Sequence, residues 1–195
     1  MEPLGVAQTK THLRFGSAAE DGLIENWILA ARQHFEQQTG RQLVTATWDV
    51  WLDGFPCGSV IELPHPPLLT VTSVKYYDTT NTLQTWAATN YVVQAPAGPY
   101  AARGQVEVAS GVSWPSTTWR QDAVKIRYTA GYGSRPDDVP EIVRTALYLL
   151  VGHFWTNREE VIALLGGTWS AMPLGASVLI KGFEAHPQRA MRRAA

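Results

Sequence analysis

Residues 135–161 read RPDDVPEIVRTALYLLVGHFWTNREEV, and this stretch decides which fold the rest of the sequence can adopt. Val143, Leu147 and Val151 are apolar and widen an apolar stripe, so the predicted helix needs cover from its own domain or from a neighbouring subunit. We expect the two leucines at the centre of the stripe to be buried in the subunit or in an assembly. The stripe itself has helical spacing and comprises Ile142, Ala146, Leu149, Leu150, His153 and Phe154.

The two ends of this stretch carry helix-boundary signals. Asp137 or Asp138 can cap the start, and Pro140 suits the first turn. Asn157 can end the helix. The sequence therefore predicts a helix over residues 137–156.

The first forty residues predict two more helices. Residues 8–15 can form a short helix, and residues 18–39 a long one, with Ser17 as its cap and Gly40 at its C-terminal end. One side of the long helix is apolar, with Leu23, Trp27, Ala30, Ala31, His34 and Phe35. We expect this side to pack on the helix over residues 137–156.

Between these helices the pattern changes to short runs of β-branched and aromatic residues separated by Gly and Pro. The runs lie at 45–53, 60–63, 69–78, 83–86, 90–94, 105–109 and 124–130. Strands at this spacing predict a small antiparallel sandwich or barrel. The expected fold class is α+β. A helical frame (1–43 and 132–165) carries an inserted β-domain (44–131), and an extended C-terminal tail (166–195) follows.

The composition bounds the function classes. A chain of 195 residues with 45% hydrophobic residues suits one domain with an insertion, and 17% charged residues is low enough to suggest a surface partly committed to partners. The formal net charge of -1 points to no nucleic-acid or acidic substrate. Cys57 is the only cysteine, which excludes an internal disulfide and fits synthesis in a reducing cytoplasm. We see no secretion signal and no apolar run of about 20 residues, so no membrane partner is expected.

The C-terminal end differs in charge from the rest of the chain. From Lys181 onward four basic residues face one acid, Glu184, whereas 16 of the 17 acidic residues precede this point. Just before it, the apolar run 178–180 lies between Gly175 and Gly182, which separate it from any domain core. We expect this run to add as a strand to the sheet edge of a partner; the alternative is a disordered end.

The sequence contains no catalytic constellation. None of the five histidines has a second histidine or a cysteine at metal-ligand spacing, and a helix cap explains the Asp137-Asp138 pair more simply than a cation site. There is no phosphate-binding loop and no nucleophile elbow. We therefore expect no catalytic residue, no metal and no cofactor; an enzyme with a dispersed site is the weakest alternative.

The eight tryptophans are more informative. Trp48 and Trp51 lie an odd number of positions apart on a predicted strand, so they face opposite sides and one of them is exposed. Trp114 and Trp119 lie in a predicted loop, where exposed aromatic rings suit a protein interface or a sugar-binding site. The alternative is that the tryptophans fill the cores of two small layers.

Four blocks of the sequence together resemble one protein family. They are LIENWILAARQHFEQQTGRQLVTATWDVWLDGFP (23–56), ELPHPPLLTVTSVKYYDTTNTLQTW (62–86), YTAGYG (128–133) and DDVPEIVRTALYLLVGHFWTNRE (137–159). In this order they resemble the head-tail connector proteins, also called adaptor or head-completion proteins, of tailed phages, prophages and gene transfer agents. The resemblance covers roughly residues 9–158.

The resemblance implies a structural role in a particle. Such proteins form a ring, typically of twelve copies, beneath the portal protein at the capsid vertex. The ring extends the DNA channel and docks the tail through a tail-side stopper or terminator protein, and packaged DNA passes without sequence specificity. The C-terminal segment would reach the portal through Val178, Leu179, Ile180, Lys181, Phe183, Arg189, Arg192 and Arg193.

A ring requires one face of a subunit to meet a different face of the next. Exposed aromatic residues and the wide apolar helix supply the candidates for this contact, namely Trp51, Trp114, Trp119, Leu147 and Val151. The alternative function is a Trp-rich carbohydrate-binding module, although such a module has no need of a helical frame. A glycan array would separate the two.

Overall fold

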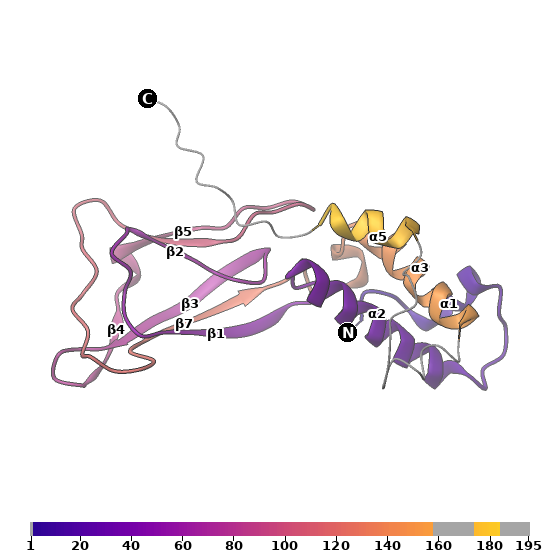
Figure 1. The fold of residues 1–195 in the computed structure, drawn as a ribbon, viewed down its shortest axis with the longest axis horizontal. Coiled ribbons are helices and arrows are strands. Elements are labelled where there is room, and N and C mark those ends of the chain that lie inside the picture. Colours follow the sequence, from indigo (N-terminus) through magenta and orange to yellow (C-terminus); the bar gives the residue numbers. More distant parts are fainter. Residues whose placement is uncertain (1, 158–173, 184–195) are drawn as a thin grey trace, which may run out of the picture. The chain divides into compact units, whose positions relative to one another are not determined.

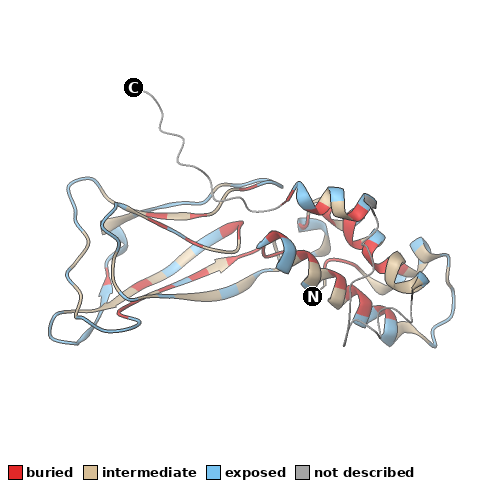
Figure 2. Ribbon diagram, viewed as in Figure 1, coloured by how far each residue is buried: buried red, intermediate tan, exposed pale blue. Residues whose placement is uncertain are grey.

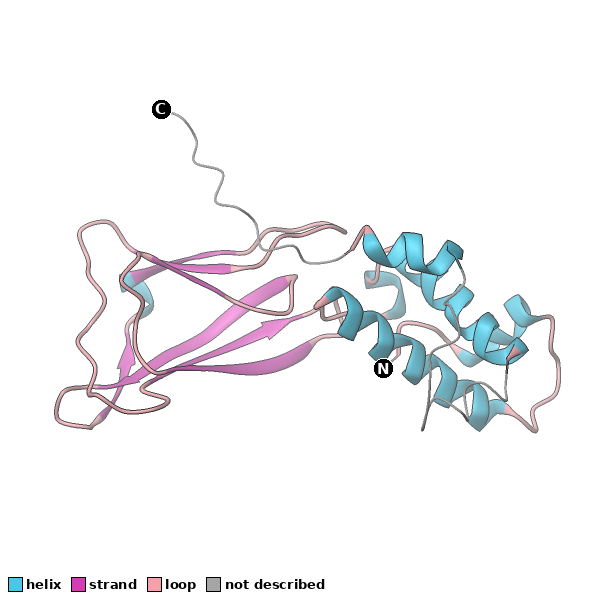
Figure 3. Cartoon of the chain, in the orientation of Figure 1, coloured by secondary structure: helices cyan, strands magenta, loops and turns pink. Residues whose placement is uncertain are grey.

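The computed structural model describes residues 2–157 and 174–183, which form two compact units (Figures 1 and 3). The helical unit takes residues from both sides of the β unit in sequence: up to Val44 and again from Tyr132. The β unit spans Thr45–Gly131. Helices and antiparallel sheets in one chain confirm the α+β class.

The helical unit contains α1 (Val6–Leu13), α2 (Asp21–Thr39), α3 (Glu141–Thr156) and α5 (Leu174–Lys181), with a 3-10 turn η2 (Pro136–Asp138) before α3. Gly40 ends α2 with a left-handed φ of 65°, and its N–H donates to the Glu36 carbonyl at 2.9 Å. Asn157 ends α3. The predicted packing of α2 on α3 is confirmed.

The predicted cap of α3 is wrong. Asp137 and Asp138 lie in η2, and α3 begins only at Glu141. The Asp138 carboxylate accepts the Arg135 backbone N–H at 2.9 Å, so it closes the 3-10 turn instead of the helix. Ser17 likewise accepts the N–H of Ala19 and does not cap α2.

The core of the helical unit is built from three helices. Leu149 is 37% exposed and Ile142 is exposed to the same extent, whereas Leu150 is 1% exposed. The buried stripe of α3 is thus rotated from the predicted one, toward the residues that were predicted only to widen the stripe. Its members are Val143, Ala146, Leu147, Leu150 and Val151; they pack with Ile24, Trp27, Ile28, Ala31 and Phe35 of α2 and with Ala176 and Ile180 of α5 (Figure 2).

The C-terminal apolar run is a helix, so its prediction as an isolated strand is wrong. Residues 178–180 lie within α5, where Ile180 and the following Phe183 are buried in the helical core. The Phe183 ring packs 5.9 Å from that of Phe35, and its carbonyl accepts a 2.7 Å hydrogen bond from Nε of the buried Arg41. A glycine at each end does not isolate a helix whose other side chains find core partners, and residues 174–183 therefore belong to the helical unit.

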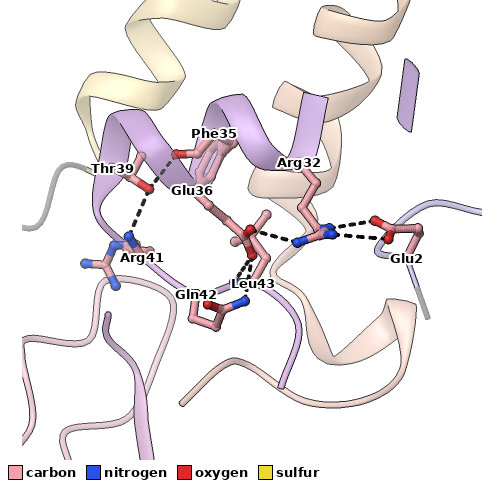
Figure 4. A network of polar contacts seen from close by, with 8 residues as sticks. All are labelled: Glu2, Arg32, Phe35, Glu36, Thr39, Arg41, Gln42 and Leu43. Carbon is pink, nitrogen blue, oxygen red and sulfur yellow. Dashed lines mark hydrogen bonds and ion pairs between the residues drawn. The ribbon is translucent and has the colours of Figure 1, made fainter. Parts of the chain in front are cut away.

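A polar network holds the chain where it leaves α2 (Figure 4). One Glu36 oxygen accepts the Leu43 N–H at 2.9 Å and the Gln42 amide at 3.0 Å, and the other accepts Nη1 of Arg32 at 2.8 Å. Arg32 in turn binds Glu2 through Nε at 2.7 Å. Desolvation lowers the pKa of Arg32, yet its hydrogen bonds and the two carboxylates outweigh this and raise the pKa overall. The network ties the segment that follows α2 to the helix itself.

The β unit is a sandwich of two antiparallel sheets. One sheet has the order β1-β7-β3-β4 and the other β2-β6-β5. The strands are β1 (Ala46–Leu52), β2 (Val60–Glu62), β3 (Leu68–Tyr77), β4 (Leu83–Trp86), β5 (Tyr91–Gln94), β6 (Gln105–Val108) and β7 (Val124–Ala130), with a 3-10 turn η1 (Ala88–Asn90) before β5. The predicted strands are confirmed to within a residue or two.

The inner faces of the two sheets share one core. Strand β7 alternates strictly, with Val124, Ile126 and Tyr128 buried, and these pack with residues such as Ile61 and Val106 of the smaller sheet. The Tyr128 hydroxyl donates to the Pro64 carbonyl at 2.9 Å, and burial raises the pKa of this phenol. The outer faces of the two sheets therefore point in opposite directions.

Burial within α3 predicts unequal effects of two neighbouring substitutions. Leu150→Ala should lower the free energy of unfolding by about 2–5 kcal/mol, because it leaves a cavity in the core. Leu149→Ala, at a partly exposed position, should lower it by about 1 kcal/mol or less. Urea unfolding of both variants and the parent tests this; equal losses would mean that the buried stripe has been assigned to the wrong side of α3.

Candidate interaction surfaces

The exposed faces of the described residues are the candidate surfaces for partners. Within residues 2–157 and 174–183 no group of three or more His, Cys, Asp or Glu side chains could hold a metal ion. His34 is half buried on α2, where desolvation lowers its pKa, and the ring of His153 contacts the Asn157 amide at 2.9 Å. No helix in this part of the chain has the length and apolar content of a membrane span. The outer faces of the two sheets and one sheet end carry exposed charged and aromatic residues.

The outer face of the four-stranded sheet is basic. Cross-strand register places Lys75 of β3 opposite Lys125 of β7, and Arg127 of β7 opposite Asp49 of β1. Three cations and one carboxylate are the charged residues on this face of the sheet. Lys75 has no ion pair among the described residues. Like charges directly opposite each other on neighbouring strands are unfavourable, so this face is suited to an acidic partner.

The single carboxylate holds two of the cations. Asp49 accepts two 2.8 Å hydrogen bonds from the Arg127 guanidinium and contacts Nζ of Lys125 at 2.9 Å. Hydrogen bonds from Arg127, then from Lys125, hold the pKa of this carboxyl far below its usual range. Lys125 also lies 4.5 Å from the ring centre of Trp51, which is 47% exposed. The prediction that Trp48 and Trp51 face opposite sides is confirmed, since Trp48 packs against the core.

One end of the same sheet presents a fully exposed tryptophan. Trp119 precedes Arg120, whose guanidinium lies 3.9 Å from the ring centre of Tyr77 and donates to the Asn81 side chain at 3.1 Å. The adjoining turn is organised by Asp78, which accepts hydrogen bonds from Thr80, Thr82 and Gln84. These bonds, led by that of the Thr80 hydroxyl, lower the pKa of Asp78 to about 2. Trp119 therefore projects from a locally ordered scaffold and stays an interface candidate.

Trp114 is not exposed in the same way. Its ring stacks on Phe55 with centroids 4.8 Å apart and lies 4.9 Å from that of Trp86. Its indole N–H donates to the Gly58 carbonyl at 2.6 Å. The ring therefore fills the edge of the sandwich core. Part of the ring stays exposed, so an interface role for Trp114 stays a prediction, although its packing leaves less of the ring for a sugar platform.

The outer face of the three-stranded sheet is acidic. Glu107 of β6 lies opposite Val60 of β2 and Val92 of β5, and Glu62 of β2 lies opposite Gln105. Glu107 accepts the Gln94 amide at 2.7 Å and has no ion pair among the described residues. Glu62 has Nη1 of Arg103 at 3.9 Å.

The remaining predicted site residues fall into three groups. Leu147 and Val151 are fully buried in their own subunit, which corrects their assignment to a subunit interface. In α5, Val178 and Lys181 are exposed and Leu179 is half-buried, whereas the buried side chains of Ile180 and Phe183 face the subunit core. Arg189, Arg192 and Arg193 lie outside the described residues, and portal binding by this segment stays a prediction.

Sequence reasoning missed the charged sheet faces. Their members are separated by up to 78 positions in sequence, as for Asp49 and Arg127, and the outer positions of β3 and β7 meet only through the register. The alternation of the KIR run at 125–127 was a usable signal, because it places two cations on one side of a strand.

The chain is similar to chains in three solved structures. One is the neck of an empty GTA particle computed with C6 symmetry, and another is the virion of a native gene transfer agent (GTA) particle. Each matched chain is 26% identical with a TM-score of 0.74, over 93% of this chain and 89% of that chain. The third, the neck of a native GTA particle computed with C12 symmetry, is 24% identical with a TM-score of 0.68, over 92% of this chain and 87% of the other, and shows the fold alone.

These likenesses confirm the resemblance to head-tail connector proteins that the four sequence blocks indicated. No protein-family model matches the chain. No curated protein matches it either.

The ion pairs of Asp49 predict a pH-dependent contribution to stability. Because folding lowers the pKa of this carboxyl, its contribution is full above the unfolded value, about 3.9, and is lost as the pH falls toward the folded one. The stability difference between the parent and Asp49→Asn should be constant near neutral pH and shrink below about pH 4. Urea unfolding across this range measures it, with Glu25→Gln on exposed α2 surface as the control. A difference unchanged by acid would contradict the ion-pair account.

Proposed function

We propose that this protein is a head-tail adaptor of a phage or phage-like particle. In this role it forms a ring under the portal, extends the DNA channel and docks the tail. One observation carries the proposal: the likeness, over 93% of the chain, to chains in gene transfer agent particles, one of them resolved as a neck. The protein would accordingly be made in the host cytoplasm and reside at the head-tail junction.

The surfaces of the molecule support a binding role. Among the described residues the β unit carries charged side chains on the outer faces of its sheets, and no group of three or more His, Cys, Asp or Glu side chains could hold a metal ion. The similar chain at 26% identity belongs to a neck that was computed with C6 symmetry, and a ring of twelve copies is compatible with that symmetry. Exposed Trp119 and the two charged faces are the surfaces available to neighbouring subunits or to the tail-side stopper or terminator protein.

The C-terminal segment is proposed to contact the portal. Within α5, the exposed Val178 and Lys181 are the contact candidates, and the basic residues beyond residue 183 extend them toward an acidic portal surface. Packaged DNA is a weaker partner for so few charges, because salt screens their attraction to phosphate. The core position of Ile180 and Phe183 ties the start of this segment to the folded subunit.

Deletion of the gene tests the adaptor role. Cells that produce the particle should then release heads without attached tails, because the docking surface is missing, and a plasmid-borne copy should restore tailed particles. Negative-stain images and the nuclease-protected DNA in each preparation are the measurements. Tailed, DNA-filled particles in normal number without the gene would contradict the proposal.

Truncation tests the portal contact separately. A chain ending at Phe183 keeps the core residues of α5, whereas a cut after Gly175 would remove Ala176, Ile180 and Phe183 from the core. We expect the chain ending at Phe183 to fold with an unchanged melting temperature and, because it keeps Val178 and Lys181, to co-sediment with purified portal more weakly than the full-length chain.

The matched variant keeps the full length and replaces Arg189, Arg192 and Arg193 by Ala. A partial, salt-sensitive loss in this variant would assign only part of the affinity to charge. Equal co-sedimentation of the truncated and full-length chains would refute a role for residues 184–195.

A further inference from the structure

The β unit carries opposite charge on its two opposite faces. The four-stranded sheet presents Lys75, Lys125 and Arg127 against Asp49. The three-stranded sheet presents Glu62, which has Arg103 at 3.9 Å, and Glu107. Because the inner faces share one core, the basic and acidic faces point away from each other. A partner with charge of a single sign would satisfy only one of them.

We propose that these two faces meet between neighbouring copies of this chain, so that the basic face of one subunit packs on the acidic face of the next. The inference deepens the proposed adaptor role and rests on it. A front-to-back contact is heterologous: each copy leaves one face of each kind open for a further copy, and the series closes into a ring when the rotation allows.

Two side chains single out this contact. Lys75 lies opposite another lysine on the neighbouring strand and has no ion pair among residues 2–157 and 174–183. Glu107 on the opposite face has no ion pair in the same part of the chain. Each therefore gains a counter-charge when the faces of two copies meet, which no contact within one described subunit supplies.

Apolar residues at both faces support the same pairing. Trp51 is 47% exposed beside Lys125, and Val92 is 53% exposed directly opposite Glu107. An exposed aromatic residue on one face and an exposed aliphatic residue on the other provide apolar area next to the charges. Aromatic residues with a polar surround are typical of protein interfaces.

The charge pairs at such a contact are weak individually. Exposed ion pairs contribute about 0–1 kcal/mol each and are screened by salt. The contact therefore orients neighbouring subunits and leaves most of the assembly energy to apolar contacts and to the surface on which the ring is built. High ionic strength should therefore weaken the contact without abolishing it.

Cysteine cross-linking in purified particles tests the proposal. In a Cys57→Ser background, the chain with both Lys75→Cys and Glu107→Cys replaces the parent, and the particles are treated with a short bis-maleimide. The two positions lie on opposite outer faces of one sandwich, so a link between them joins two chains. We expect a ladder that extends beyond dimers for the double variant and monomers alone for each single variant.

The other outcomes overturn the proposal in distinguishable ways. Monomers alone from the double variant, with the chain present in the particles, would contradict this contact and leave the adaptor role intact. Dimers from a single-cysteine variant would mean that like faces meet. Absence of the parent chain from the particles would contradict the adaptor role itself.

If the chain with both cysteine substitutions is absent from the particles, reversing the charge of the same two residues tests the contact. Lys75→Glu alone and Glu107→Lys alone should each lower the amount of the chain per particle, because like charges then meet. The double reversal in one chain restores opposite signs and should recover the parent amount. A double variant no better than either single variant would overturn the pairing.

Discussion

The structure depends on the junction at which the chain leaves the helical unit and returns to it. Val44 forms a parallel bridge with Gly133, and the Tyr132 N–H donates to the Leu43 carbonyl at 3.1 Å. Glu36 holds the outgoing strand by two hydrogen bonds, and Arg41 contacts the Tyr132 hydroxyl at 3.3 Å. The segment that leaves the helical unit and the segment that returns to it are hydrogen-bonded to each other. The 87 residues between them can therefore fold as a separate sandwich while α2 and α3 close one core. The same Arg41 binds the Phe183 carbonyl, so the junction also anchors the end of α5.

The two units expose different kinds of surface. Helices α2, α3 and α5 bury their apolar faces on one another and leave partly exposed side chains such as Leu149 and Val178. The sandwich buries its inner faces and leaves two outer faces whose charges differ in sign. A subunit of this kind has different surfaces on different elements, which is what contact with several unlike partners in a particle requires. Packing of the core within each unit holds the exposed side chains in position, and the charge of a surface favours partners of opposite charge.

The sequence was sufficient for the fold class and for the helices and strands up to residue 157, because the period of apolar residues changes from helical to alternating near Gly40 and back after Gly133. The sequence was insufficient to predict which side of α3 faces the core. Its apolar residues cover much of the circumference, so periodicity could not tell Leu147 and Val151, which are buried, from Ile142 and Leu149, which are partly exposed. The run at 178–180 was predicted to add as a strand to a partner because it is apolar and lies between two glycines, and the sequence does not reveal the core that covers Ile180. The charged faces needed the strand register, which sequence spacing alone does not supply.

The central claim is that this chain is a ring-forming component of a particle neck. A cryo-electron microscopy reconstruction of the neck, computed without imposed symmetry from particles that carry this chain, tests it most directly. The account predicts copies of the chain arranged as a closed ring beneath the portal, each β unit in contact with the next. A neck whose density is accounted for by other proteins, with this chain absent, would contradict it.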